Sequence, residues 1–274
     1  MRESRPALPG EMIDDRYAVE RVLGSGGMGE VLAVRDRSTG KRFALKRLLK
    51  DAKARHTMLL SREFHTLHGL AHPNVVQTFD YGLNQGLPYY TMELLEGSDV
   101  EGMAPLHWSQ VVPILRDVTS ALSLLHARHL LHRDVSARNV WRTTSGVVKL
   151  MDFGTLASFG DAIDIAGTPP YLAPEALRSR LLDQRTDLYA VGALGYFLLT
   201  GRHAYPARAL SELEQYWSEA PIPLAERIAK LERNELEAPP ERLDQLLEAL
   251  LSLEPDARPS SAAEVLEWLE QILP

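Results

Sequence analysis

Short runs of alternating apolar and polar residues fill the early part of the chain, a pattern typical of β-strands. Residues 17–24 form one such run and residues 30–48 a longer one. The turn-forming sequence RSTGK at 37–41 interrupts the longer run, so it predicts a hairpin. Two further strands are predicted at 75–83 and 87–95.

A helical pattern separates these two groups of strands. Residues 54–70 place apolar side chains at mixed three- and four-residue steps, and Pro73 then ends the helix. Residues 15–95 are therefore expected to form a small antiparallel sheet with one helix. The Pro- and charge-rich residues 1–14 are expected to be loosely ordered.

Helical patterns dominate the rest of the chain, after a hinge that is expected at 93–97. The predicted fold class is α+β with two lobes, a strand-rich N-lobe at 15–95 and a larger, mostly helical C-lobe at 96–274. The strongest helical patterns lie at 111–129, 186–201, 241–253 and 262–273.

Composition narrows the class of protein. A chain of 274 residues suits one large domain or two lobes. The formal net charge of −7 does not favour binding to nucleic acid or to anionic lipid. The absence of cysteine excludes disulfides, zinc–thiolate sites and thiol nucleophiles. No apolar run approaches the roughly 20 residues of a membrane span, and no apolar signal core opens the chain. A cytoplasmic protein without nucleic-acid or membrane partners is expected.

A glycine-rich stretch follows the first predicted strand, with the spacing Gly24-x-Gly26-x-x-Gly29. Glycines let backbone amides approach phosphate groups closely. The same spacing also occurs in Rossmann turns and in simple hairpins, but a Rossmann turn requires a helix directly afterwards. Here a strand pattern follows, so a glycine loop between antiparallel strands, covering a nucleotide, is favoured.

Lys46 lies within an otherwise apolar strand pattern. A lysine at a strand edge can extend its charged end into water. A lysine that faces a binding site instead needs a carboxylate partner, and Glu63 on the predicted helix is the candidate.

The sequence HRDVSARN at 132–139 concentrates polar chemistry between two apolar runs. It is either a solvated loop or a reactive one. Asn139, together with Asp152 of the nearby sequence MDFG, offers hard oxygen ligands that suit Mg²⁺. Asp134 is then left to accept a proton from an alcohol.

Together with the segments around them, these stretches occur in the order GSGGMGEV, FALK, HRDVSARN, DFG, GTPPYLAPE, DLYAVG and DARPS. The chain thereby resembles a protein kinase over about residues 15–272, most of all the bacterial, eukaryotic-type (Hanks-type) Ser/Thr kinases. The resemblance implies a bilobal fold, ATP and Mg²⁺ as cofactors with Mn²⁺ as an alternative metal, and a protein with a Ser or Thr acceptor as substrate.

The resemblance also implies a role for particular residues. Lys46, held by Glu63, would contact the α- and β-phosphates. Asn139 and Asp152 would hold the metal, Asp134 would act as catalytic base, and Thr168 would lie beside it in the substrate loop. The residues implied around the nucleotide are Leu23, Gly24, Ser25, Gly26, Gly27, Met28, Gly29, Val31, Ala44, Lys46, Met92, Glu93, Leu95, Asp99 and Trp141.

Three further contacts are implied as structural. Glu175 should pair with Arg258, and His132 should pack with Phe153 in the core. Asp187 should hold the backbone of residues 132–139, which correspond to the catalytic loop of the family.

Two positions depart from the family pattern. Ser136 stands where most Ser/Thr kinases carry a lysine that contacts the γ-phosphate, and Arg138 stands where tyrosine kinases carry an arginine. Arg138 is the candidate to replace the missing charge. Trp141 is larger than the aliphatic residue usual at the floor of the adenine site, so it either crowds the base or packs beside it.

The segment 152–175 has no hydroxyl in its middle. Arg133 matches an arginine that binds a loop phosphate in many kinases. The hypothesis is that Asp161 or Asp164 supplies this negative charge instead. A nucleotide-binding pseudokinase scaffold, a dual-specificity or tyrosine kinase and a small-molecule kinase are the alternative functions. Dimerisation and a separate regulatory partner stay open.

Overall fold

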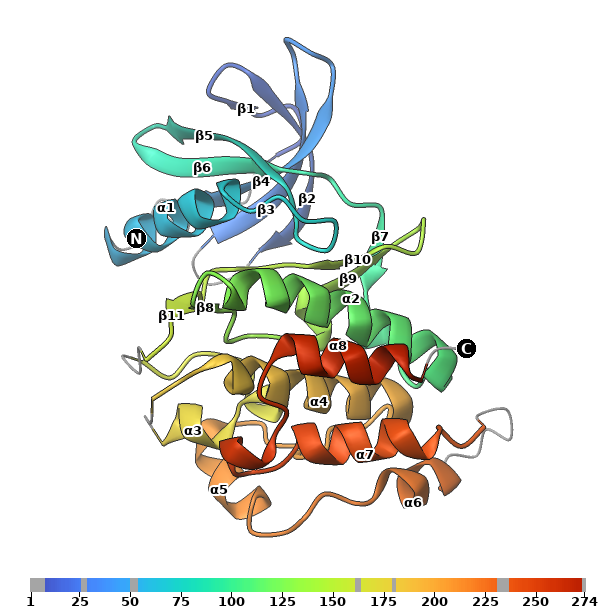
Figure 1. Cartoon of the computed structure of the whole chain (residues 1–274). Coiled ribbons are helices and arrows are strands. Elements are labelled where there is room, and N and C mark those ends of the chain that lie inside the picture. Colours follow the sequence, from blue (N-terminus) through green and yellow to red (C-terminus); the bar gives the residue numbers. More distant parts are fainter. Residues whose placement is uncertain are drawn as a thin grey trace. The chain divides into compact units, whose positions relative to one another are not determined.

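The computed structural model describes residues 8–25, 29–49, 54–160, 164–178, 181–230 and 237–272. The chain separates into two compact units, Met1–Glu96 and Gly97–Pro274 (Figure 1). We refer to them as unit 1 and unit 2 and describe each by itself.

Unit 1 is a six-stranded antiparallel sheet with the strand order β1-β2-β3-β4-β6-β5. The helix α1 (Ala54–His68) packs against β4, β5 and β6. The turn after Asp36 joins β3 to β4, as the hairpin pattern predicted. The strands are β1 (Met12–Ile13), β2 (Tyr17–Ser25), β3 (Gly29–Asp36), β4 (Arg42–Leu48), β5 (Thr78–Asn84) and β6 (Leu87–Met92).

The core of unit 1 follows the alternation of the strands, because every second side chain of a strand points to the same face. Tyr17 and Val19 of β2 are buried together with Leu32 and Val34 of β3. Tyr89 of β6 completes this cluster, and its ring meets that of Tyr17 edge-on at a centroid distance of 5.9 Å.

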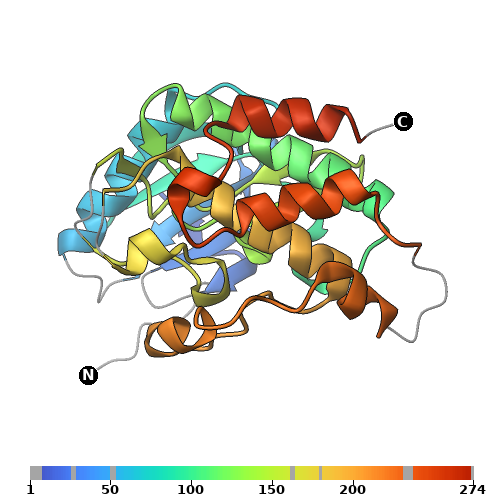
Figure 2. The same cartoon turned by 60° about the horizontal axis from the view of Figure 1, so that its bottom comes forward.

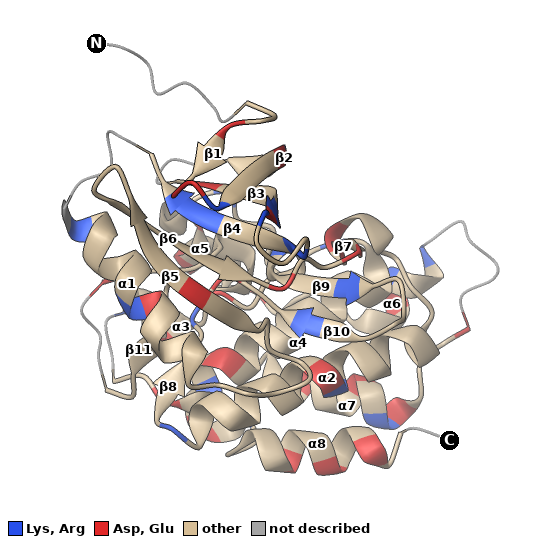
Figure 3. Ribbon diagram, turned by 90° about the horizontal axis from the view of Figure 1, so that it is seen from above, with Lys and Arg blue, Asp and Glu red and all other residues tan. Residues whose placement is uncertain are grey.

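Unit 2 is built around helix α4 (Gln184–Thr200), which packs against α2 (Trp108–His126) and α7 (Glu241–Leu250) (Figure 2). Helix α8 (Ala262–Glu270) packs against α2 and α7, and its outward side carries acidic residues (Figure 3). The remaining helices are α3 (Pro174–Leu177), α5 (Leu213–Tyr216) and α6 (Leu224–Ala229).

Nearly every residue of α4 is buried, so this helix has neighbours on all sides. Two glycines make this packing possible. A Cβ on Gly192 would lie 2.7 Å from Leu250 of α7, and one on Gly195 would lie 2.6 Å from Leu247. The helix begins at Asp183, whose side chain accepts a hydrogen bond from the Arg185 N–H, and ends at Gly201 with a φ of 65°.

Short strands complete unit 2 and support its loops. β10, β9 and β7 form a three-stranded sheet, and β11 pairs with β8. None of the helices in the described part of the chain has the length and apolarity that crossing a bilayer requires. The strands are β7 (Gly97–Asp99), β8 (Leu130–Leu131), β9 (Val140–Thr143), β10 (Val148–Leu150) and β11 (Ala157–Ser158).

Candidate active site

Lys46 and Glu63 form a close ion pair within unit 1. The Lys46 Nζ donates to Glu63 Oε1 at 2.8 Å and to Oε2 at 3.0 Å. Tyr90, which lies opposite Lys46 on β6, donates its hydroxyl to Glu63 Oε1 at 3.0 Å. Glu63 is buried, so these two donors stabilise its charge. The ion pair expected from the sequence is present, and Tyr90 is a further member that sequence reasoning missed.

The glycine-rich stretch joins two antiparallel strands, as expected. Gly24 pairs with Val31 and Ser25 with Glu30, so no helix follows the glycines. Gly29 is required by packing, since a Cβ there would lie 2.4 Å from the carbonyl oxygen of Arg47. Gly26, Gly27 and Met28 lie outside the described residues.

The other nucleotide candidates of unit 1 occupy β3, β4 and the stretch after β6. Ala44 of β4 lies directly opposite Met92 of β6, and both are buried. The Glu93 N–H donates to the Gln77 carbonyl at 2.9 Å, and Glu93 Oε1 accepts from the Gln77 N–H at 2.8 Å. Leu23 is exposed, whereas Val31 and Leu95 are partly buried.

Asp134 is the centre of a hydrogen-bonded group in unit 2. Its Oδ1 accepts from the Thr168 N–H at 2.9 Å and from the Thr168 hydroxyl at 2.7 Å. Its Oδ2 accepts from Asn139 Nδ2 at 2.7 Å. The structure therefore brings Thr168 of a later segment to Asp134 and Asn139, two residues of HRDVSARN that the sequence singled out.

Asp187 of α4 holds the backbone of the catalytic loop by hydrogen bonds. Asp187 Oδ2 accepts from the His132 N–H and Oδ1 from the Arg133 N–H, both at 2.9 Å. His126 is buried, and its Nε2 lies 2.9 Å from Asp187 Oδ2. Burial alone would raise the pKa of Asp187, but its hydrogen bonds to His126 and the loop outweigh this, so its pKa lies below the ordinary 3.8. The anchoring role expected for Asp187 is confirmed.

Replacing Asp187 by asparagine is expected to lower the free energy of unfolding by about 1–3 kcal/mol, because one buried loop donor loses its acceptor. The pKa of Asp187 is lower in the folded state than in the unfolded state. Its ionised carboxylate therefore stabilises the fold at pH values above the ordinary pKa of 3.8, and this stabilisation is lost as the pH falls through the folded-state pKa. In urea unfolding at neutral pH, the wild type should have a higher free energy of unfolding than Asp187→Asn. This difference should become smaller at acidic pH. A pH-independent difference would contradict this.

Asp152 follows β10 and has a left-handed backbone, with a φ of 56°. The next residue, Phe153, is buried and meets the His132 ring at a centroid distance of 4.8 Å. The Thr155 hydroxyl donates to the His132 carbonyl at 2.7 Å. The predicted packing of His132 with Phe153 is present, and it ties the segment after Asp152 to the catalytic loop.

The donor set of Asn139 and Asp152 fits a hard divalent cation. Asn139 Nδ2 points to Asp134, which directs its carboxamide oxygen away from that carboxylate. Asp152 is exposed, and its Oδ1 also accepts weakly from the Gly154 N–H at 3.4 Å. Carboxylate and carboxamide oxygens are ligands that Mg²⁺ accepts, with water and phosphate completing the coordination.

Arg138 forms an ion pair with Glu101 and not with Asp134. Its Nε donates to Glu101 at 2.8 and 2.9 Å while 74% of its side chain is exposed. The hydrogen bond to Glu101 raises the pKa of Arg138. Ser136, at the position of the usual lysine, is only 3% exposed. Sequence reasoning missed Glu101, because no spacing relates it to Arg138.

Trp141 and Asp99 lie opposite each other on β9 and β7. The indole Nε1 is buried and has no hydrogen-bond partner among the described residues. Asp99 Oδ1 accepts from the Glu101 N–H at 3.1 Å. Trp141 is therefore a partly buried residue of the small sheet of unit 2, and it pairs with the residue proposed to bind ribose.

Glu175 and Arg258 form the predicted salt bridge. Arg258 Nη1 donates to Glu175 Oε1 at 2.7 Å and Nη2 to Oε2 at 2.9 Å. Both side chains are buried, and the guanidinium also lies 4.9 Å from the centroid of the Tyr189 ring. This pair fixes the end of the segment that carries Thr168.

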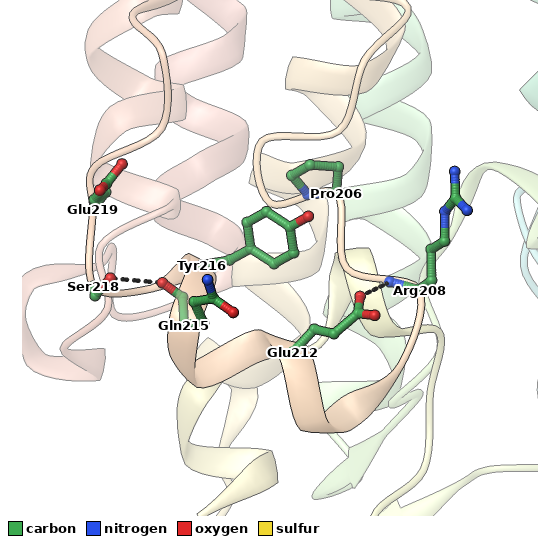
Figure 4. A pocket seen from close by; sticks show the side chains of 7 residues that line it. All are labelled: Pro206, Arg208, Glu212, Gln215, Tyr216, Ser218 and Glu219. Atoms are coloured by element: carbon green, nitrogen blue, oxygen red, sulfur yellow. Dashed lines mark hydrogen bonds between the residues drawn. The ribbon is translucent and has the colours of Figure 1, made fainter.

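A separate pocket of about 710 Å³ lies beside α5 and is lined by residues between Pro206 and Glu219 (Figure 4). Two of its polar side chains are hydrogen-bonded to the backbone of other residues that line it. Glu212 Oε2 accepts from the Arg208 N–H at 2.7 Å, and the Ser218 hydroxyl donates to the Gln215 carbonyl at 2.6 Å. None of the residues proposed to bind nucleotide or metal lines this pocket.

Residues 17–269 match the family described as the protein kinase domain. The chain belongs to the protein kinase family. The kinase domain is 32% identical to the serine/threonine-protein kinase Nek4 of Mus musculus, over 89% of this chain and 31% of that protein. It is 31% identical to the serine/threonine-protein kinase PknB of Mycolicibacterium smegmatis, over 92% of this chain and 42% of that protein.

The crystal structure of the Mycobacterium tuberculosis PknI kinase domain superposes with a TM-score of 0.74 at 28% identity, covering 97% of this chain and 99% of that one. The fold class and the resemblance to bacterial Hanks-type kinases are thereby confirmed. Both curated relatives are named serine/threonine-protein kinases, and the kinase domain spans less than half of the length of either.

Proposed function

We propose that the kinase domain transfers the γ-phosphoryl group of ATP to a Ser or Thr hydroxyl of a protein substrate. The observation that carries this proposal is the group formed by Asp134, Asn139 and Thr168. A carboxylate that accepts the hydroxyl hydrogen of Thr168 at 2.7 Å has the orientation needed to accept one from a substrate alcohol.

In this proposal the acceptor oxygen forms a bond to the γ-phosphorus as the bond to the β-bridging oxygen breaks. ADP leaves, and Asp134 takes the hydroxyl proton and passes it to water. Lys46, positioned by Glu63, binds the α- and β-phosphates, and Asn139 and Asp152 hold the metal. Bound Mg²⁺ or Mn²⁺ supplies charge neutralisation on the phosphates.

We assign the nucleotide-binding roles to the residues inferred from the family pattern. Ala44 and Val31 cover the adenine, Glu93 and Leu95 bind its edge through their backbone, and Asp99 binds the ribose. Residues 15–95 then correspond to the N-lobe and 96–274 to the C-lobe. The segment 1–14 was expected to be loosely ordered, but its strand β1 (Met12–Ile13) pairs with β2 and buries Ile13 in the core of unit 1. We place the protein in the cytoplasm, acting on protein substrates rather than on nucleic acid.

The main competing function is a pseudokinase that binds nucleotide without transferring phosphate. The engagement of Arg138 by Glu101 and the burial of Ser136 are the observations that favour it, since neither side chain brings a positive charge to Asp134. A tyrosine or dual-specificity kinase is favoured by Arg138 alone.

The test is phosphoryl transfer from labelled ATP to the protein itself and to a generic basic protein, with Mg²⁺ and with the metal chelated. We expect metal-dependent transfer, with label on Ser or Thr after acid hydrolysis. Label on Tyr would establish the alternative specificity. Nucleotide binding without any transfer by the folded protein would establish the pseudokinase.

A further inference from the structure

The arginine before Asp134 holds the segment that leads to Thr168. The Arg133 Nη2 donates to Asp164 Oδ1 at 3.1 Å and also to the Asp164 backbone carbonyl. The Arg133 side chain is only 7% exposed, whereas that of Asp164 is 70% exposed. The buried member of the pair is therefore the guanidinium, which needs acceptors to replace the water it has lost.

The backbone of Arg133 touches the same segment. A Cβ on Gly167 would lie 2.6 Å from the Arg133 carbonyl oxygen, and Gly167 has a φ of 122°. Only glycine lets the segment pass this close in this conformation. The next residue, Thr168, is the one bonded to Asp134. Asp164, Gly167 and Thr168 thus contact two consecutive residues of the catalytic loop.

The chemistry of this segment excludes a phosphate in its middle. Residues 159–167 contain no Ser, Thr or Tyr. The flanking hydroxyls are those of Thr155, Ser158, Thr168 and Tyr171, outside this stretch. The Thr155 and Thr168 hydroxyls donate to the His132 carbonyl and to Asp134 Oδ1, and Ser158 lies in β11. The negative charge opposite Arg133 is consequently built into the chain as a carboxylate. Asp161, the other candidate, lies outside the described residues.

We propose that Asp164 is a positioning residue whose pairing with Arg133 holds residues 164–168 so that Thr168 meets Asp134, and that the kinase domain needs no phosphorylation of this segment. Asp164 acts through Arg133 and Thr168 and does not touch substrate. Its effect on catalysis rests on the proposed function, while its effect on the segment does not.

The experiment compares the wild-type chain with Asp164→Asn, which removes the charge at nearly constant shape, and with Asp164→Glu, which keeps it. Glu226→Gln is the matched control, because Glu226 is an exposed carboxylate on α6 that pairs with Lys230 at 2.6 Å. The first readout is hydrogen exchange of the Thr168 amide, which donates to Asp134. We expect faster exchange in Asp164→Asn and wild-type exchange in the other two variants.

The second readout is steady-state transfer to the basic protein. For Asp164→Asn we expect kcat/KM for the protein acceptor to fall about 10- to 100-fold, as for a displaced positioning group, with KM for ATP unchanged. Pretreating the wild type with a phosphatase should leave its rate unchanged.

Unchanged Thr168 exchange in Asp164→Asn would overturn the positioning role. Loss of wild-type activity after phosphatase treatment would overturn the independence from phosphorylation. If the wild type transfers no phosphate but the exchange difference is found, the proposed function fails while the positioning role stands.

Discussion

Replacing Asp134 by asparagine is expected to lower kcat by about 10²- to 10⁴-fold, the usual contribution of a positioned general base. The carboxamide keeps the size of the carboxylate but accepts no proton at neutral pH. Its nitrogen would also meet the Asn139 Nδ2, which now donates to Asp134 Oδ2 at 2.7 Å. The variant should therefore fold and bind ATP, yet transfer phosphate slowly.

Initial rates with labelled ATP, a nucleotide-binding titration and urea unfolding would separate these effects. Asp256→Asn is the matched control, since Asp256 is an exposed carboxylate that pairs with Arg185 and takes no part in the site. A variant at Asp134 that retains wild-type kcat would rule out Asp134 as the base. Loss of folding in this variant would show that the carboxylate is needed for structure.

Replacing Glu175 by glutamine is expected to lower the free energy of unfolding by about 3–5 kcal/mol, because it leaves the guanidinium of Arg258 buried without its counter-charge. Arg258 is also held by the carbonyls of Ser252 and Arg185 at 2.8 and 3.0 Å. These neutral acceptors do not compensate a lost carboxylate. The end of the segment that carries Thr168 should loosen first.

Urea unfolding with a double-mutant cycle measures this coupling. The double variant Glu175→Gln with Arg258→Met should recover part of the loss, since no buried charge is then left unpaired. Glu214→Gln is the control, because Glu214 pairs with Arg178 on the surface and should change stability little. A loss at Glu175 no larger than that at Glu214 would contradict the expected role of burial.

Local patterns predicted most of the regular elements of this kinase domain. The alternation at 17–24 and 30–48 gives β2, β3 and β4, and the turn at 37–41 separates the last two. The boundaries are less accurate, since β6 ends at Met92 and α1 at His68, before their apolar patterns end. Tertiary packing, which local periodicity does not contain, decides where an element stops.

The site residues were found through ordered motifs, whereas their partners were not. Glu101 and Tyr90 belong to no motif, and they reach Arg138 and Glu63 only because the chain folds back on itself. The pairing of Asp164 with Arg133 likewise depends on the fold and not on spacing, and Asp161 lies outside the described residues. Burial of Ser136 depends on neighbours that no spacing reveals.

The packing of α4 limits how this protein can vary. The helix that carries Asp187 is enclosed on all sides, and the Cβ of any other residue at Gly192 or Gly195 would collide with α7. At Gly192 an added methyl group must displace the end of α7 at Leu250 or the helix that holds the catalytic loop, whereas at Gly195 it meets the ends of the Leu247 and Leu115 side chains. Substitutions about one to two helical turns from Asp187 are thus expected to lower activity by displacing the loop that Asp187 holds, without changing any residue of that loop. Tolerance to mutation in this chain should follow the surroundings of α4 more closely than distance from Asp134.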